Sequence, residues 1–129
     1  MNYELGKIRS FTDLDAWKEG HKLVLDIYSV TRKFPKEEQF GLTIQIRRAI
    51  VSFTSNIAEG FSRGSYKEKV RFYSIALGSL TEVQNQLLIA RDLKYVTAGE
   101  FDKLAKQTVK ISKITNGLIK RSRSIIPNS

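Results

Sequence analysis

Apolar residues recur along most of the chain at intervals of three and four, the spacing that places them on one face of an α-helix. Short segments with glycine, proline or capping residues separate four such stretches, and none shows the alternation of a β-strand. We therefore predict an all-α fold, an antiparallel up-down-up-down four-helix bundle. It is expected to form a single domain of residues 1–129, with helices at about 13–33, 42–62, 66–93 and 98–122.

Side chains that accept hydrogen bonds mark the predicted helix starts. Thr12 precedes the first apolar face, and we expect it to cap the first helix. Ser65 with Glu68, and Thr97 with Glu100, have the spacing of a capping box, in which both members satisfy free N–H groups of the first turn. These pairs predict where the third and fourth helices begin.

The large side chains of the first helix share one face. They predict its buried side, which comprises Leu14, Trp17, His21, Val24, Leu25 and Tyr28. The position of His21 between Trp17 and Leu25 favours a packed, hydrogen-bonded residue over a catalyst or ligand. A di-iron bundle would need Glu-x-x-His pairs on two helices, and the sequence has none.

The second helix has more than one apolar side. Beside its core face lies a polar strip that includes Arg48, Asn56, Glu59 and Arg63. On the remaining side Ile44, Val51 and Ala58 follow one another at intervals of seven. Because a helix of a monomeric bundle needs one apolar stripe, this second seam predicts burial against another copy of the chain. The alternative is a set of scattered surface residues, which is common.

The polar strip also allows two interpretations. Glu59 could act as a general acid or base beside an anion-binding Arg48. We favour a structural network of Arg48, Asn56 and Glu59 that fixes how helices or subunits pack. On the third helix, Gly78 predicts the close approach of another helix, and Glu82 is expected to pair with an arginine of the second helix.

The composition narrows the possible chemistry. The chain has no cysteine and one histidine, which excludes thiolate catalysis and thiolate zinc sites and leaves little for imidazole chemistry. We expect no metal, no cofactor and no enzymatic activity. No apolar run approaches the ~20 residues of a membrane helix, and the N-terminus lacks the apolar segment of a signal peptide. We therefore expect a cytoplasmic protein that does not bind membranes.

The net charge of +9 is distributed unevenly. Residues 94–129 hold eight basic and two acidic residues, and the expected outward face of the fourth helix carries Lys103, Lys106, Lys110, Lys113 and Lys120, continued by Arg121 and Arg123. A stripe of like charges with almost no acid predicts contact with nucleic acid. The alternatives are ordinary solvation of a surface helix and, ranked behind, an anionic membrane, because the bundle core already uses the apolar face.

Three segments resemble a known family: FTDLDAWKEGHKL, FPKEEQFGLTIQIRRAIVSFTSNIAEGFSRGS and FYSIALGSLTEVQNQL. Over roughly Phe11 to Leu118, with QIRRA, SNIAEG and GSLTE in order, the chain is similar to the bacterial 23S rRNA intervening-sequence proteins. Relatives include the accessory variability determinant of diversity-generating retroelements. The resemblance implies a ring-like homopentamer without established enzymatic activity, and in the retroelement type basic surfaces that bind nucleic acid and a reverse transcriptase. The matching residues are Arg47, Arg48, Asn56, Glu59, Gly60, Arg63, Gly78, Ser79 and Glu82.

These observations lead to one expected function and two alternatives. We expect a non-enzymatic, oligomeric bundle that binds nucleic acid, RNA in preference to DNA, within a nucleoprotein complex. The first alternative is a scaffold for a protein partner, in which the positive charge serves solubility or acidic surfaces. The second is an enzyme built around Glu59 or Glu82, which a lone carboxylate among small helical residues supports weakly.

Overall fold

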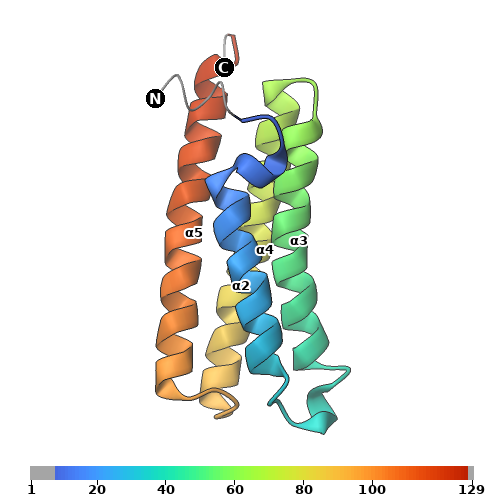
Figure 1. The fold of residues 1–129 in the computed structure, drawn as a ribbon, viewed down its shortest axis with the longest axis vertical. Helices are drawn as coiled ribbons and strands as arrows, with labels where there is room; N and C mark the ends of the chain where they lie inside the picture. The colour runs from blue at the N-terminus through green and yellow to red at the C-terminus, as the bar shows by residue number, and fades with distance from the viewer. Residues whose placement is uncertain (1–7, 128–129) are drawn as a thin grey trace.

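The computed structural model describes residues 8–127, and within them the chain is helical without a β-strand. The helices are α2 (Asp15–Thr31), α3 (Leu42–Ser62), α4 (Tyr66–Asp92) and α5 (Ala98–Ile125), with short 3-10 turns η1 (Phe11–Asp13) and η2 (Lys36–Glu38). Consecutive helices run in opposite directions, so both ends of the described range lie at the end of the bundle that holds the α3–α4 turn (Figure 1). The predicted fold class, an antiparallel four-helix bundle, is confirmed.

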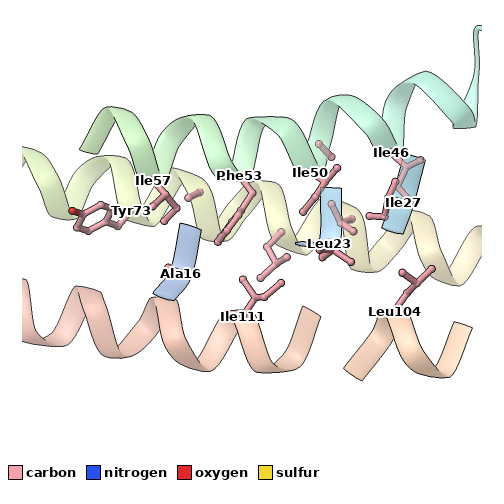
Figure 2. Packing of buried hydrophobic residues seen from close by; sticks show 14 of the residues in the cluster. Ala16, Leu23, Ile27, Ile46, Ile50, Phe53, Ile57, Tyr73, Leu104 and Ile111 are labelled. Carbon is pink, nitrogen blue, oxygen red and sulfur yellow. The ribbon is translucent and has the colours of Figure 1, made fainter. Parts of the chain in front are cut away.

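Each helix packs against two neighbours. α3 lies between α2 and α4, and α5 closes the bundle by contacting α4 and α2. The apolar core runs along the bundle axis and includes Leu23, Ile50, Phe53, Leu104 and Ile111, all at most 1% exposed (Figure 2). Burial of such side chains stabilises the fold by about 1.5–3 kcal/mol each. A smaller apolar cluster of Phe34, Leu42, Ala90 and Val96 fills the end of the bundle opposite the α3–α4 turn.

The buried side of α2 matches the prediction only in part. Leu14, just before the helix, is buried as predicted, and Trp17 and Val24 pack partly buried against the core. The buried residues of the helix itself are Ala16, Gly20, Leu23, Ile27 and Thr31. The approach of α3 explains the difference, because a Cβ atom on Gly20 would lie 2.6 Å from the Phe53 ring. Small residues therefore face the partner helix, and the larger Leu25 and Tyr28 remain exposed.

The prediction that His21 is a packed core residue is wrong. Its side chain is exposed, and its ring stacks on Trp17 with centroids 4.7 Å apart. Trp17 in turn contacts Phe11 edge to face. His21 therefore belongs to a surface row of aromatic rings on α2.

Side chains start the helices, with one change from prediction. Ser10, and not Thr12, caps the first turn: its hydroxyl accepts the Thr12 N–H, and the Asp13 carboxylate accepts the Ser10 N–H. This turn is η1, and α2 follows it directly. The Ser65 hydroxyl accepts the Glu68 N–H at the start of α4, but the return bond from the Ser65 N–H to the Glu68 carboxylate is absent, so only half of the predicted capping box forms. The capping box at the start of α5 is complete.

Candidate nucleic-acid interface

The core packing of α5 turns its cations outward. Its buried side consists of Leu104, Thr108, Ile111, Thr115, Ile119 and Ser122. The seven predicted contact residues are all exposed: Lys103, Lys106, Lys110, Lys113, Lys120, Arg121 and Arg123. The helix is therefore amphipathic in the sense predicted, with a polar side dominated by positive charge.

The expectation that this stripe is almost free of acid needs correction for its N-terminal half. Asp26 of α2 lies 3.9 Å from the Lys103 ammonium and also accepts a hydrogen bond from Gln107. Asp102, one turn earlier on α5, lies 2.9 Å from Lys106. These carboxylates offset much of the positive charge that the sequence of α5 displays.

Lys110 has a carboxylate partner on α2 as well. Its ammonium lies 3.2 Å from Glu19, whose other oxygen binds Lys22 at 2.9 Å. Hydrogen bonds from Lys22 and then Lys110 lower the pKa of the Glu19 carboxyl, so this acid is ionised at neutral pH. The Lys103–Asp26 and Lys110–Glu19 pairs join α5 to α2 and link residues that are far apart in sequence.

Three cations in the C-terminal half of α5 have no such compensation. Within residues 8–127 no carboxylate lies within 4.0 Å of Lys113, Lys120 or Arg121. The sequence after Asp102 contains no acidic residue at all. The stripe therefore consists of a compensated half and a strongly positive half.

Arg47 has a structural role inside the chain. Its Nε donates a hydrogen bond to the Thr31 hydroxyl at 2.8 Å, and its guanidinium lies 4.5 Å from the centre of the Tyr28 ring. The Thr31 hydroxyl in turn donates a hydrogen bond to the Ile27 carbonyl, which connects Arg47 to the backbone of α2. Arg47 thus joins α3 to the last turn of α2.

The predicted network of Arg48, Asn56 and Glu59 does not form within the chain. Asn56 donates to the Ser52 carbonyl at 2.8 Å, and Glu59 pairs with Arg63 at 3.2 Å. The reason is distance, since Arg48 and Glu59 are three turns apart, roughly 16 Å along the helix. Glu59 is exposed and already paired, which is not the buried environment that shifts a carboxyl toward acid–base catalysis.

Arg48 and Glu82 lie beside the same surface hollow between α3 and α4. The hollow measures about 390 Å³, and Ser52 and Gln86 also line it. No ion pair joins Arg48 and Glu82, so the predicted pairing of Glu82 with an arginine of α3 is absent within residues 8–127. The buried Oε1 of Gln86 lacks a hydrogen-bond partner there. This hollow therefore contains polar groups without partners.

Gly78 does not allow close helix approach within the chain. It lies on the exposed side of α4, and nothing lies within 4 Å of the position where a Cβ atom would be. The intimate contact is made one residue later, where the Ser79 and Ser52 hydroxyls lie 2.9 Å apart.

The second seam of α3 lies on the outside of the chain. Val51 is 38% exposed, while Ile44 and Ala58 are half-buried. A second hollow, of about 570 Å³, runs along this side and is lined partly by Tyr28, Ile44 and Val51. The seam is thus available to a partner, and its role in assembly stays a prediction.

Residues 8–127 contain no group of three or more His, Cys, Asp or Glu side chains placed to hold a metal ion. In the same range no helix is long and apolar enough to cross a membrane.

The fold and the charged surface define the class of this chain as an all-α, basic four-helix bundle. The chain belongs to the 23S rRNA-intervening sequence protein family, whose profile matches residues 12–117. A protein with unknown function from the S23 ribosomal protein family of Bacteroides thetaiotaomicron VPI-5482 has a similar crystal structure, with a TM-score of 0.75. The match covers 81% of this chain and 95% of that one at 21% identity, a likeness in fold alone. No curated protein sequence matches the chain.

Proposed function

We propose that this chain is a non-enzymatic four-helix bundle that assembles with copies of itself and binds nucleic acid in the cytoplasm. RNA is the preferred ligand over DNA, and the bundle acts within a nucleoprotein complex. The observation that carries the proposal is the exposed row of cations on α5, from Lys103 to Arg123. Lys113, Lys120 and Arg121, which have no carboxylate within 4.0 Å among residues 8–127, offer a phosphate backbone three positive charges in succession. Membership in a family named for an rRNA intervening sequence supports RNA as the ligand.

Binding of this kind is electrostatic and depends little on the nucleotide sequence. The row consists of lysine and arginine side chains on a helix that is already packed against the core, so it does not enter a groove as a recognition helix does. Filter-binding titrations with single- and double-stranded RNA and DNA test the proposal at low and high salt. We expect affinity to fall steeply with salt, because phosphate contacts release counterions. An affinity that salt leaves unchanged would contradict it.

The outer side of α3 and α4 supports self-assembly. Gly78 costs roughly 1 kcal/mol relative to alanine inside a helix, and no contact within the chain requires it. Nearby, Arg48, Glu82 and the Gln86 oxygen lack partners that a second copy would supply. We propose a homopentamer, the number that the family resemblance implies. A mass measurement in solution tests it, and a monomer at all concentrations would exclude assembly.

A protein-binding scaffold is the second candidate. It is favoured by the exposed apolar side chains of Leu25, Tyr28, Phe40 and Val51, which cover parts of α2, α3 and the segment between them. Exposed apolar clusters mark protein contacts more often than nucleic-acid contacts. The same titration separates the candidates: a chain that binds none of the four nucleic acids at low salt is a scaffold.

A further inference from the structure

The positive charge of the α4–α5 layer is concentrated at one end of the bundle. Residues 66–79 and 112–127 occupy the end with the α3–α4 turn (Figure 1) and hold seven basic residues but one acid, Glu68. Residues 80–111 form the other end of the same two helices and hold five basic and four acidic residues. The two ends of one surface therefore differ greatly in net charge.

Contacts at the start of α4 determine which cations remain available there. Arg63 pairs with Glu59 at 3.2 Å, and Arg71 lies 3.5 Å from Glu68. Lys69 is partly buried: it donates to the Phe61 carbonyl, and desolvation lowers its pKa. Lys67 is exposed without a carboxylate within 4.0 Å among residues 8–127. Lys67 thus resembles the cations of the α5 C-terminal half.

We propose that the nucleic acid contacts this end of the α4–α5 layer, through Lys67, Lys113, Lys120 and Arg121, and not the whole α5 stripe. The inference rests on the proposed function and locates its site. A lysine paired with a carboxylate adds little attraction, because phosphate must displace the acid or lie beside it. Each lysine of the N-terminal half has such a partner: Asp26 lies 3.9 Å from Lys103, Asp102 lies 2.9 Å from Lys106, and Glu19 lies 3.2 Å from Lys110.

The spacing of the available cations suits a phosphate chain. Lys113 and Lys120 are two helical turns apart, about 10.5 Å along α5. Because Lys113 and Lys120 lie on the same side of α5, one continuous phosphate backbone can contact both of them.

Two matched triple variants of the full chain test the location. One carries Lys113→Gln, Lys120→Gln and Arg121→Gln, and the control carries Lys103→Gln, Lys106→Gln and Lys110→Gln. Both remove three positive charges, so a difference between them reports position and not net charge. The probes are a single-stranded RNA and an RNA duplex of mixed sequence, titrated over a range of salt. Circular dichroism and mass in solution establish that both variants fold and assemble as the wild type does.

The proposal predicts a strong effect of the first triple and a weak effect of the control. For the duplex, three lost contacts make the slope of log K against log salt shallower by about 2.7. Affinity at low salt then falls at least about tenfold, whereas the control changes it less than about threefold. Equal losses, or a larger loss in the control, would overturn the proposed location. If the wild type binds neither RNA, the proposed function fails first, and this inference with it.

A measurement on the wild type removes any dependence on variant folding. Lysine acetylation with and without bound RNA is read by mass spectrometry at each residue. The proposed location is supported if bound RNA protects Lys67, Lys113 and Lys120 from acetylation while Lys103, Lys106 and Lys110 are still modified. The reverse pattern rejects it.

Vesicles rich in anionic lipid serve as the competing polyanion. Binding to vesicles without binding to RNA would assign this surface to a membrane instead.

Discussion

Tyr95 donates its hydroxyl hydrogen to Glu38 across 2.9 Å, which ties the turn between α4 and α5 to the segment that precedes α3. The second oxygen of the same carboxylate accepts the Leu42 N–H at 3.0 Å. Since Gly41 has no side chain to cap α3, Glu38 performs that function from η2. One carboxylate therefore starts a helix and joins two connections at the same end of the bundle.

Replacing either partner should lower thermal stability in a defined order. Tyr95→Phe removes one hydrogen bond, whereas Glu38→Ala removes that bond and the cap of α3. We expect the melting temperature of Glu38→Ala to fall further, by several degrees, when followed by circular dichroism. Identical melting temperatures for Glu38→Ala and Tyr95→Phe would mean that the α3 cap contributes nothing.

The acid dependence of this contact follows from the Glu38 pKa. Hydrogen bonds from the Leu42 N–H and then the Tyr95 hydroxyl lower the pKa below the ordinary 4.5. The stability gained from the lowered pKa is present above that ordinary value and is lost as pH falls through the folded value. The melting difference between wild type and Glu38→Ala should therefore shrink in acid. A constant difference would contradict this assignment.

Two glycines should respond in opposite directions to the same substitution. In Gly60→Ala the new methyl group would lie 2.7 Å from the Tyr73 ring, which is buried in the core (Figure 2). We expect a loss of about 1–3 kcal/mol in the free energy of unfolding by urea. Gly78→Ala meets open space and should raise the stability of the chain by about 1 kcal/mol. A stabilised Gly60→Ala would show that the Tyr73 ring moves aside freely.

A larger side chain at Gly78 tests the proposed assembly surface. Gly78→Leu should shift the mass in solution toward the monomer, because a helix of another copy would no longer approach closely. Asn116→Leu, at an exposed site on α5, is the control and should leave the mass unchanged. An intact assembly in Gly78→Leu would place the subunit contact elsewhere.

Alkaline pH should destabilise the bundle through Tyr73. Burial raises the pKa of its phenol to about 12, from an ordinary 10.0. The folded state therefore keeps a proton that the unfolded state loses, so stability is full below pH 10 and declines as pH rises toward 12. The loss amounts to about 2–3 kcal/mol at most. Tyr73→Phe should show a flatter profile of urea midpoint against pH, and parallel profiles would exclude Tyr73 as the cause.

The sequence predicted the fold well because helical periodicity and caps are local signals. The starts of α4 and α5 follow from Ser65 and Thr97, whose partners lie three residues away. The buried side of α2 is predicted only in part, because the prediction rests on the size of the side chains alone. Gly20 is buried since Phe53 needs the space, a requirement that only the position of α3 reveals.

The candidate site was predictable in part for a similar reason. The cations of α5 share a face by their spacing, and the structure places all of them outward. Their compensation was predictable only for Lys106, because Asp102 lies four residues before it, whereas Glu19 reaches Lys110 from a helix about ninety residues earlier in the chain. Periodicity locates charges on one helix but carries no information about the helix beside it.

The direction of the helices has a practical consequence for labelling this protein. Both ends of the described range, residues 8–127, lie at the end of the bundle toward which the C-terminal half of α5 runs (Figure 1). A polyhistidine tag or an acidic fusion there would change the local potential and distort measured affinities. The chain contains no cysteine, so an uncharged fluorophore attached through Phe40→Cys, at an exposed position of the far end, would report binding without adding charge at the proposed contact.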